Sequence, residues 1–372
     1  MRFTIERTSI FKALNHVQSV VERRNTIPIL SNVLIQAAEG TISLTATDLD
    51  IEVIERVAAD VAQGGSTTAP AHTLYDIVRK FPEGSQVEIE QGPDENRLTV
   101  RSGRSRFTLQ ALPPEDFPDL SIGDMTHEFV VAAGVLKQLI EKTRFAISTE
   151  ETRYYLNGIY LHEVTADGSP MLRAVATDGH RLAQVQVPSP EGAQGMPGVI
   201  VPRKTVLELH RLIEDATGDV RTSLSESKIR FRFGDITLTS KLIDGTFPDY
   251  ERVIPRDNDR VLEVDTKLFA QAVDRVSTVS SDKGRAVKLN IVPDKLTLSV
   301  NNPESGSAVE ELAASYQSEP LDIGFNARYL LDITAQLESD SACFYLADSG
   351  SPTVVRDKDD DTALYVLMPM RV

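Results

Sequence analysis

Hydrophobic residues recur at helical spacing in six segments of the chain. In segment 8–21, Ile10, Leu14, Val17 and Val21 fall on one helical face, and Thr8 is the expected N-cap. A comparable apolar face is present in each of the other five segments. We therefore expect helices over 8–21, 71–81, 132–148, 202–215, 265–281 and 326–339.

Between and after these helices, the pattern changes to the alternation typical of half-buried strands. Segment 229–233 alternates apolar and basic residues, Gly234-Asp235 predicts a turn, and the alternation resumes at Ile236. The last such segment, 363–370, is apolar almost to the end of the chain. Runs of strands with segregated helices indicate an α+β fold with antiparallel sheets.

The elements repeat along the chain. Phe117-Pro118-Asp119 returns as Phe247-Pro248-Asp249, and Thr47-Asp48 returns as Thr177-Asp178, each 130 residues later. This spacing is longer than that of solenoid repeats, so each copy is expected to be a small domain with its own core. The remaining segment supplies the same parts in the same order. We predict three copies of one domain, over 1–125, 126–252 and 253–372.

Composition limits the classes of protein. Hydrophobic residues make up 41% and charged residues 25% of the chain, which is ordinary globular usage. No apolar run approaches the roughly 20 residues of a membrane span, and no secretory leader is recognisable. The single cysteine, Cys343, excludes an internal disulfide, and the scattered histidines make a zinc site improbable. We expect a cytoplasmic protein without membrane association, metal or cofactor.

The net charge of −16 argues at first against a polyanionic partner. The predicted helices nevertheless carry a net positive charge, so the acidic residues are concentrated in strands and loops. Lysine and arginine are good helix formers, which explains part of this bias. Alternatively, the helices share one face that meets a polyanion while the sheets face away.

Segment 176–181 contains the candidate catalytic chemistry. Asp178 could orient His180 as a general base, but no nucleophile or metal ligand lies at a fitting spacing. Asp178-Gly179 more often forms a turn between strands, and Thr47-Asp48 fills the equivalent place without a histidine. We therefore favour the turn. No phosphate-cradling glycine loop or nucleophile elbow is present.

Two further segments suggest binding surfaces. Arg153-Tyr154-Tyr155, interpreted as a strand, places adjacent tyrosines on opposite faces, so one of them is available for packing or for stacking on a nucleic acid. The apolar terminus 366–372 is either a buried final strand or a groove lined by methionines. Pro369 is expected to end strand pairing, which favours the groove.

At this point the chain resembles the bacterial DNA polymerase III beta subunit family, the replication sliding clamps. The resemblance covers the whole chain. It rests on segments 26–30 (TIPIL), 101–107 (RSGRSRF), 153–158 (RYYLNG), 176–183 (ATDGHRLA), 201–204 (VPRK), 247–255 (FPDYERVIP), 324–326 (GFN) and 368–371 (MPMR).

The resemblance implies three domains of DNA-clamp topology per chain, with paired helices inside and antiparallel sheets outside. Two chains would join head to tail into a dimeric ring that encircles double-stranded DNA, slides on it and confers processivity without chemistry of its own. A basic lining and an acidic exterior would explain the charge distribution. The implied partners are the polymerase III catalytic subunit, the clamp loader and the repair or translesion polymerases, bound through short peptide motifs.

The resemblance also assigns residues. The partner-peptide pocket would be formed by Leu156, Thr177, Gly179, His180, Arg181, Leu182, Pro248, Arg252, Val253, Asn326, Tyr329, Val366, Met368, Pro369, Met370 and Arg371. The residues expected to contact DNA are Arg24, Arg153, Tyr154 and Tyr155. The dimer interface would join Phe107 and Leu109 of one chain to Thr278 and Val279 of the other.

The chain departs from the family at the rim of this pocket. Gly284 stands in place of a phenylalanine, and Gly350 and Pro352 stand in place of a valine and a serine. We therefore expect a changed peptide preference. The acidic cluster expected near 304–311 is thin, so apolar contacts should decide dimer stability.

Three functions remain to be compared. A DNA clamp predicts a dimer that is retained on circular DNA. A hydrolase dependent on Asp178 and His180 predicts a turnover that is lost when His180 is replaced. A scaffold oligomer that binds no nucleic acid is disfavoured by the basic helices and the adjacent tyrosines.

Overall fold

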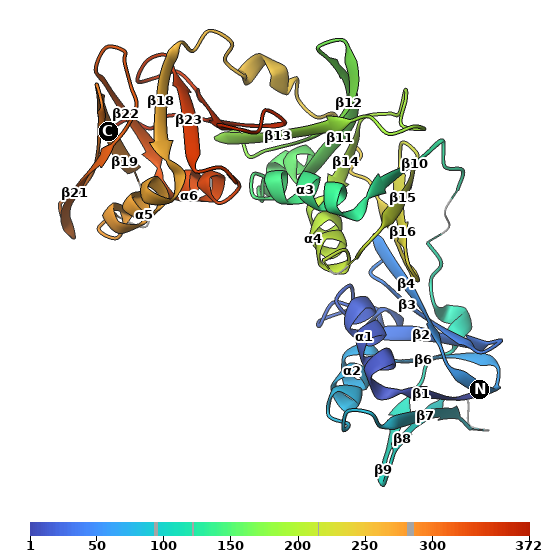
Figure 1. Ribbon diagram of the computed structural model, residues 1–372. Helices are drawn as coiled ribbons and strands as arrows, with labels where there is room; N and C mark the ends of the chain where they lie inside the picture. Colours follow the sequence, from blue (N-terminus) through green and yellow to red (C-terminus); the bar gives the residue numbers. More distant parts are fainter. Residues whose placement is uncertain (93–95, 121–122, 215, 281–285) are drawn as a thin grey trace. The chain divides into compact units, whose positions relative to one another are not determined.

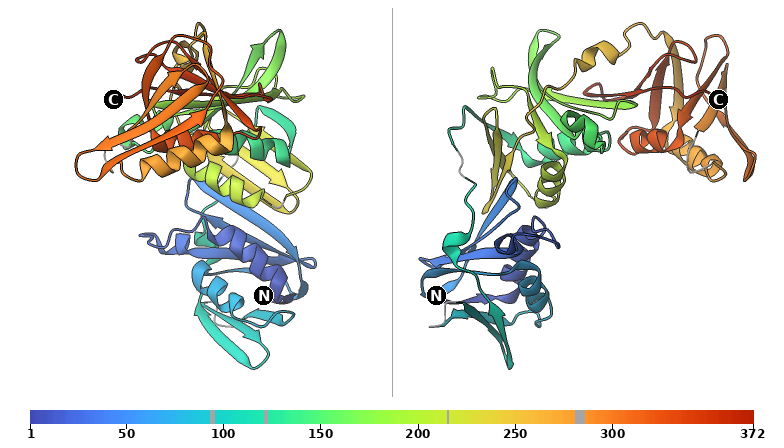
Figure 2. Two further views of the ribbon diagram at one scale, coloured as in Figure 1. Left: turned by 60° about the vertical axis from the view of Figure 1, so that its left-hand side comes forward. Right: turned by 180° about the vertical axis from the view of Figure 1, so that it is seen from behind.

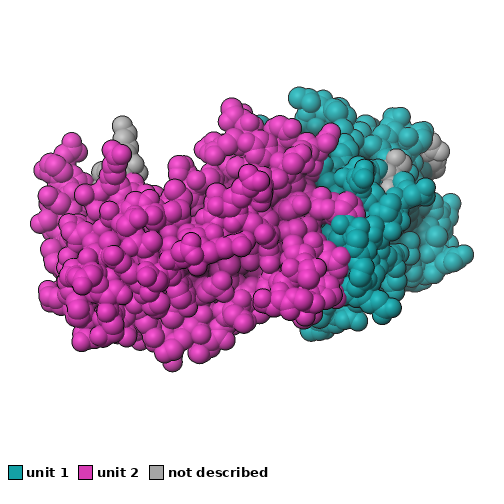
Figure 3. Space-filling view, turned by 90° about the horizontal axis from the view of Figure 1, so that it is seen from above, with its two compact units in different colours: residues 1–136, 190–196, 204–242 teal, residues 137–189, 197–203, 243–372 magenta. Residues whose placement is uncertain are grey.

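The computed structural model of the chain describes residues 1–92, 96–120, 123–214, 216–280 and 286–372 (Figures 1 and 2). The chain divides into two compact units, coloured separately in Figure 3. The first comprises residues 1–136, 190–196 and 204–242. The second comprises residues 137–189, 197–203 and 243–372.

In the part of the first unit that the structure describes, two antiparallel sheets form. The five-stranded sheet has the order β5 (Asp60–Gln63), β1 (Arg2–Glu6), β7 (Gln86–Gln91), β8 (Arg97–Ser102), β9 (Ser105–Gln110). The eight-stranded sheet has the order β10 (His127–Ala132), β15 (Asp219–Leu224), β16 (Lys228–Phe233), β17 (Ile236–Lys241), β4 (Ile51–Ala58), β3 (Thr41–Thr47), β2 (Asn32–Ala38), β6 (Gly65–Pro70).

Two helices of the first unit lie side by side, α1 (Arg7–Gln18) and α2 (Ala71–Arg79) (Figure 1). Their apolar faces are buried, with Ile10, Leu14 and Val17 fully inaccessible in α1. The N-cap of α1 is Glu6, whose carboxylate accepts a hydrogen bond from the Ser9 amide, so the prediction of Thr8 was wrong. A carboxylate oxygen can accept from the amides of the first turn as a hydroxyl does, which explains the earlier start of the helix.

The second unit also contains two antiparallel sheets among its described residues. The eight-stranded sheet has the order β14 (Val199–Pro202), β11 (Gly158–Ala166), β12 (Ser169–Thr177), β13 (Arg181–Pro188), β25 (Ala363–Leu367), β24 (Thr353–Asp357), β23 (Ser341–Leu346), β18 (Arg260–Asp265). The four-stranded sheet has the order β21 (Gly306–Ala313), β20 (Lys295–Asn302), β19 (Ala286–Val292), β22 (Leu321–Asn326).

The remaining helices follow the predicted segments. In the second unit, α5 (Thr266–Ser277) packs against α6 (Ala327–Thr334). Helix α3 (Ala133–Arg144) begins in the first unit and continues into the second, and α4 (Arg203–Leu212) lies almost wholly in the first. Single 3₁₀ turns occur at η1 (Pro28–Ser31), η2 (Pro114–Asp116), η3 (Glu151–Leu156) and η4 (Tyr250–Val253).

The repeat predicted from Thr-Asp extends to individual hydrogen bonds. In the β3–β4 turn, the Thr47 hydroxyl donates to the Ile51 carbonyl and Asp48 accepts from two backbone amides. In the β12–β13 turn, the Thr177 hydroxyl donates to the Arg181 carbonyl and Asp178 again accepts from two amides. The same turn therefore recurs 130 residues later, as the sequence indicated.

Each eight-stranded sheet continues across a boundary between repeats. In the first unit, β4 of the first repeat pairs with β17 of the second, with Val53 opposite Leu238. In the second unit, β13 of the second repeat pairs with β25 of the third, with Ala183 opposite Tyr365. We call these pairings the first and second junction. Both join the strand after the Thr-Asp turn to the last strand of the next repeat.

Candidate functional site

An apolar pocket of about 360 Å³ opens at the second junction. Its residues come from the second repeat, the connector after β17, and the end of the chain. The lining residues are Arg153, Tyr155, Leu156, Thr177, Gly179, His180, Arg181, Leu182, Pro248, Asp249, Tyr250, Val253, Val366 and Met368. All of them belong to the second unit.

The floor of the pocket is built by cross-strand packing. Leu182 in β13 lies opposite Val366 in β25, and Val366 lies opposite Val354 in β24. All three belong to one buried cluster on this face of the sheet. Side chains alternate between the faces of a strand, so this register fixes an apolar row beneath the pocket.

The connector that carries the second Phe-Pro-Asp forms one wall. The Phe247 ring stacks on Tyr160, with centroids 4.8 Å apart and planes 7° from parallel. This packing anchors Pro248 and Tyr250 against the sheet. Burial raises the pKa of Tyr250, although the hydrogen bond from Arg173 opposes the shift, so the phenol stays protonated at neutral pH.

The Thr177–Arg181 turn forms another wall and depends on a glycine. Gly179 has a φ of +89°, in the left-handed region that favours glycine. A Cβ atom at this position would lie 2.6 Å from a guanidinium nitrogen of Arg153. Gly179 is therefore required by its backbone conformation, and a side chain there would also displace the end of the Arg153 side chain.

Arg181 is almost completely buried and links three elements. Its guanidinium donates to Asp178, to Asp332 of α6 and to the Phe145 carbonyl, at 3.1, 2.6 and 2.6 Å. It also stacks over the Tyr329 ring, 4.3 Å from the centroid. These contacts use the charge within the protein, so Arg181 shapes the pocket rather than offering a free cation to a ligand.

The last residues of the chain are held in place by backbone hydrogen bonds. The Met368 amide donates to the His180 carbonyl, and the Met370 amide donates to the Gly324 carbonyl in β22. A Cβ atom at Gly324 would lie 2.3 Å from Val372, so this glycine lets the tail approach. Strand β25 is buried, and of the two methionines in the segment Met368 lines the pocket, so the binding groove stays a prediction.

The segment around the two tyrosines is not a strand. Residues 151–156 form η3, a 3₁₀ helix, so the opposite-face argument for Tyr154 and Tyr155 was wrong. Tyr154 is 53% exposed, and its ring meets Tyr155 edge to face. A bidentate ion pair with Glu150 raises the pKa of Arg153 and orients its side chain.

The structure brings ten of the predicted pocket residues together: Leu156, Thr177, Gly179, His180, Arg181, Leu182, Pro248, Val253, Val366 and Met368. Six others do not line it. Asn326 caps α6, Tyr329 covers Arg181, and Arg252 is exposed and paired with Asp249. Pro369, Met370 and Arg371 continue along the tail.

Sequence reasoning missed two lining residues and assigned two others elsewhere. Asp249 and Tyr250 follow directly on the repeated Phe-Pro, which was the available signal. Arg153 and Tyr155, assigned to DNA, line the pocket. Gly350 and Pro352 lie in the β23–β24 loop outside the lining, and Gly284 lies outside the described residues.

The predicted interface residues occupy sheet edges and helix ends. Phe107 is 38% exposed on edge strand β9, and its ring contacts Phe81. Leu109 is half-buried on the same strand. Thr278 is exposed at the C-cap of α5, and the carbonyl of half-buried Val279 accepts a hydrogen bond from Asn302. Arg24 is exposed after α1.

The geometry favours the turn over a catalytic dyad. Asp178 accepts hydrogen bonds from the His180 backbone amide and from the Arg181 side chain, so it orients the loop. Across the described ranges, no group of three or more histidine, cysteine, aspartate or glutamate side chains is placed to hold a metal ion. No helix in the described part of the chain is long and apolar enough to cross a membrane.

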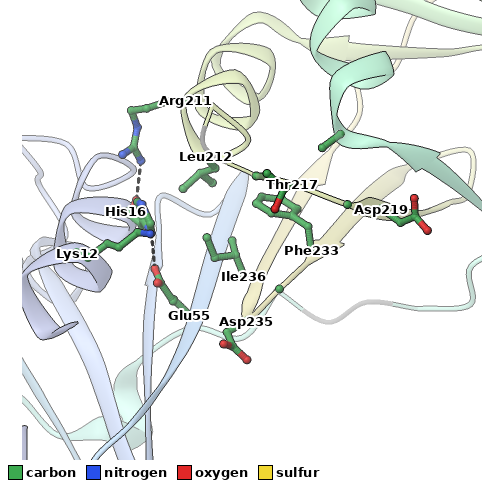
Figure 4. A pocket seen from close by; sticks show the side chains of 14 residues that line it. Lys12, His16, Glu55, Arg211, Leu212, Thr217, Asp219, Phe233, Asp235 and Ile236 are labelled. Atoms are coloured by element: carbon green, nitrogen blue, oxygen red, sulfur yellow. Dashed lines mark hydrogen bonds and ion pairs between the residues drawn. The ribbon is translucent and has the colours of Figure 1, made fainter.

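A second pocket, of about 280 Å³, lies at the first junction on the helix side of the sheet (Figure 4). The Nδ1 atom of His16 in α1 forms a hydrogen bond with the Glu55 carboxylate of β4, with 2.7 Å between nitrogen and oxygen. Arg211 of α4 donates to the carbonyls of Asn15 and His16 at the end of α1. These contacts join the first and second repeats.

Comparison with known proteins agrees with the three repeats. Models of the three domains of the DNA polymerase III beta subunit match three consecutive segments that make up most of the chain. The N-terminal domain matches residues 1–121, the central domain residues 130–249, and the C-terminal domain residues 251–371.

Individual relatives cover the full length. The beta sliding clamp of Caulobacter vibrioides strain NA1000 is 56% identical over 372 residues, with 100% of both chains covered. A crystal structure of the Bartonella birtlesii sliding clamp bound to griselimycin has a TM-score of 0.97 at 56% identity, covering 100% of both chains. A structure of the C. crescentus clamp has a TM-score of 0.98 at 56% identity, covering 100% of this chain and 99% of that one. The chain therefore belongs to the DNA polymerase III beta subunit family, the beta sliding clamps.

Proposed function

We propose that two copies of this chain join head to tail into a ring that encircles double-stranded DNA and tethers replicative and repair polymerases. The proposed domains are 1–125, 126–252 and 253–372. The role is mechanical and needs no catalysis. The observation that carries the proposal is that two junctions of identical construction leave a third pair of matching strands unpaired within the chain.

The unpaired strands are the edges of the two smaller sheets. Strand β9 ends the five-stranded sheet, and β21 ends the four-stranded sheet. By position in its repeat, β9 corresponds to β17 and β25, and β21 corresponds to β4 and β13. Exposed edges of this kind invite pairing with another chain. Pairing of β9 with β21 of a second copy would repeat the junction and, by symmetry, form two such contacts per dimer.

The burial of equivalent residues supports this pairing. The third residue of β17, Leu238, and the third residue of β25, Tyr365, are fully inaccessible within their junctions. The third residue of β9 is Phe107, which is 38% exposed in the single chain. The corresponding third residue of β21 is Ala308. We therefore propose an antiparallel register with Phe107 opposite Ala308.

Helix ends and charges agree with the same register. Tyr365 packs against Phe145, the first residue after α3, at 5.8 Å between ring centroids. Thr278 is the first residue after α5, so Phe107 is expected to pack there. Arg104 and Arg106 beside Phe107 are exposed. They would meet the acidic strand that carries Glu310 and Glu311, which gives complementary charge.

Cross-linking tests the register. Thr108→Cys combined with Ser307→Cys places two cysteines opposite each other, within the Cα separation that a disulfide accepts. Oxidation should give a covalent dimer. The shifted pair Thr108→Cys with Leu312→Cys is the matched control and should stay monomeric on a denaturing gel. Cross-linking of the control alone, or a monomeric mass for the native protein, would refute the ring.

Encirclement predicts a topological bond to DNA. Protein loaded on nicked circular DNA should remain bound in high salt and should leave when the circle is cut to free ends. Retention on the linear product would rule out encirclement. For direct contacts, Arg24→Ala should lower the slope of log affinity against log salt by about one, because one phosphate contact is lost. The same change in slope is expected for Arg153→Ala, whereas Tyr154→Ala and Tyr155→Ala should weaken binding without changing the slope, because a neutral side chain releases no counterion.

The apolar pocket is the proposed partner site. Its apolar lining suits apolar side chains of a short peptide, as polymerases and the clamp loader would supply. The six predicted residues outside the lining would act by extending or supporting this site. Deleting residues 368–372 should abolish peptide binding and leave the dimer intact. Dissociation of the dimer would contradict the assignment, as would unchanged binding.

A further inference from the structure

A polar pocket of about 500 Å³ adjoins the apolar pocket of the second junction, on the same face of the sheet. Gln184 and Leu364 line it, and these lie two residues along β13 and β25 from Leu182 and Val366 of the apolar floor. The 3₁₀ turn η4 contributes to both pockets, with Tyr250 and Val253 in one and Glu251 in the other.

The floor of the polar pocket holds a buried cation. Arg173 is 8% exposed. Its guanidinium donates to the Gln186 side chain at 2.8 Å, to the Tyr250 hydroxyl at 2.9 Å and to Glu251 at 2.9 Å. The hydrogen bonds to Gln186 and Tyr250 hold the guanidinium in place. The third partner, Glu251, sits at the mouth with half of its side chain exposed.

Two further arginines line the rim. Among the described residues, neither Arg256 nor Arg356 has an ion-pair partner in the structure. The acidic members of the lining are Glu251, which Arg173 engages, and the exposed Asp167 and Asp361. A carboxylate between the two free guanidinium groups would gain charge-assisted hydrogen bonds that the lining residues do not supply.

We propose that this polar pocket is a second subsite that binds a carboxylate of the same partner peptide whose apolar residues fill the neighbouring pocket. This inference rests on the proposed partner site. The carboxylate can belong to an acidic side chain or to a free C-terminus. It displaces Glu251 from Arg173 and contacts Arg256 and Arg356.

The spacing suits a single extended segment. Two residues along a strand span about 7 Å, and an extended peptide covers the same distance in two residues. The path crosses η4 at Arg252, whose side chain is 84% exposed. Arg252, whose guanidinium pairs with Asp249, stands in η4 between residues that line the two subsites, which accounts for a predicted pocket residue that does not line the apolar cavity. Tyr250 lines the apolar pocket, and its hydroxyl accepts a hydrogen bond from Arg173 of the polar pocket, so the two subsites share one support.

The test begins with tiled 12-residue peptides of the polymerase III catalytic subunit, screened by fluorescence anisotropy on the full-length protein. The tightest binder is remade with Glu-Glu or Gln-Gln appended at either end, each with a free or an amidated C-terminus. The acidic extension at the productive end should tighten binding roughly threefold to tenfold at low salt, and the gain should vanish at high salt. The amidated forms distinguish a side-chain carboxylate from a terminal one.

Variants give effects of opposite sign. Arg256→Glu with Arg356→Glu should remove the gain from Glu-Glu and leave the Gln-Gln peptide unaffected. Glu251→Gln releases Arg173 and should tighten the Glu-Glu peptide by a further twofold or more. Lys267→Glu, an exposed charge reversal at the start of α5, is the matched control and should change neither.

The possible outcomes separate the two proposals. If no tiled peptide binds, or if binding survives deletion of residues 368–372, the partner site itself is wrong. If a peptide binds in the apolar pocket but the Glu-Glu and Gln-Gln extensions bind alike, only the proposed carboxylate-binding subsite is refuted. An equal gain in the double arginine variant would refute it as well.

Discussion

The two junctions between repeats share their strand pairing and differ in the side chains on each face of the sheet. At the second junction, the cross-strand row beneath the pocket runs Leu182, Val366, Val354. At the first junction, the equivalent row runs Glu52, Thr239, Arg230. The apolar row forms the floor of an open apolar pocket that can receive a ligand. The polar row is covered by the first Phe-Pro-Asp connector, whose Leu120 amide bonds to Glu52.

On the side of the sheet that carries the helices, the second junction is closed and the first junction has the open pocket. His16 in α1 and Lys142 in α3 hold corresponding places, each just before the last buried residue of its helix. Lys142 is closed over by the acidic β24–β25 turn and bonds to Asp360 at 2.8 Å. At the first junction the matching turn is the short Gly234-Asp235, so an open pocket remains beside His16. The two junctions therefore share the same strand pairing, and the local side chains determine which face of each junction has an open pocket.

The largest effect on peptide affinity is expected when Leu182 of the second junction is replaced by glutamate, the residue at the equivalent position of the first junction. Leu182→Glu puts a carboxylate on the apolar floor, where Val354 replaces the Arg230 that accompanies Glu52. An unpaired charge buried by a ligand costs about 3–5 kcal/mol, so peptide affinity should fall more than about hundredfold. Leu207→Glu, at an exposed leucine of α4, is the control. Peptide titration measures the change, and unaltered affinity would show that Leu182 is not the floor.

The second largest effect is expected on stability, when the buried Lys142 of the second junction is removed. Burial lowers the pKa of Lys142, but the hydrogen bonds to Asp360 and Glu338 outweigh this and raise it. Burial likewise opposes the lowered pKa of Asp360, which the bond from Lys142 secures. Lys142→Ala should cost about 1–3 kcal/mol in free energy of unfolding at neutral pH.

The pH dependence of this cost has a definite sign. The folded pKa of Asp360 lies below its unfolded value. Its contribution is therefore present above the unfolded value and is lost as pH falls through the folded one. Denaturant unfolding of wild type and Lys142→Ala should converge in acid. His16→Ala, the equivalent change at the first junction, should cost less at neutral pH. A larger effect from His16 would reverse the comparison.

The two Thr-Asp turns carry different residues at the position with the left-handed backbone conformation, and exchanging these residues should give changes of opposite sign. Leu49 has a φ of +80°, a strained conformation for a side chain, where Gly179 has +89°. Leu49→Gly should therefore stabilise the protein slightly, by up to about 1 kcal/mol. Gly179→Ala should destabilise it by about 1–2 kcal/mol and displace Arg153 from the pocket wall. Thermal unfolding of both variants checks the signs, and two changes of like sign would count against shared geometry.

The smallest effect is expected at the buried carboxylate of the first junction. Burial raises the pKa of Glu52 above its usual value. Because the folded state holds this proton more tightly, stability falls as pH rises through the window above the ordinary glutamate value. Glu52→Gln removes that loss and keeps an acceptor for the Leu120 amide. The variant should gain up to about 1 kcal/mol at pH 8 and nothing at pH 4, and an equal gain at both would exclude this cause.

Periodicity and repetition predicted most of the architecture. The six helices follow directly from apolar spacing, and the domains were predicted from the spacing of the Thr-Asp and Phe-Pro-Asp repeats. Ten pocket residues came from motifs that retain their local context, such as the turn at Thr177 and the tail at Met368. The 3₁₀ turn at 151–156 was missed because two tyrosines beside an arginine look equally suitable for a strand.

Other features depend on contacts between distant segments. Whether Arg181 faces a ligand or supports α6 depends on Asp332, which is 151 residues away in sequence. Asp360 lies in the acidic turn between β24 and β25, and its carboxylate accepts a hydrogen bond from Lys142, 218 residues earlier. Lys142 was also counted among the basic residues of the helices, yet it is buried and paired. Sequence spacing alone carries no signal for such pairings.

The continuous eight-stranded sheets have a consequence for how the chain unfolds. The middle repeat contributes β10 and β15–β17 to one unit and β11–β14 to the other, so it owns no complete sheet of its own. The cooperative blocks detected by hydrogen exchange should therefore be two, with their border inside the middle repeat. An isolated middle repeat would expose two bare strand edges and should aggregate, whereas cuts that follow the blocks should preserve native amide protection.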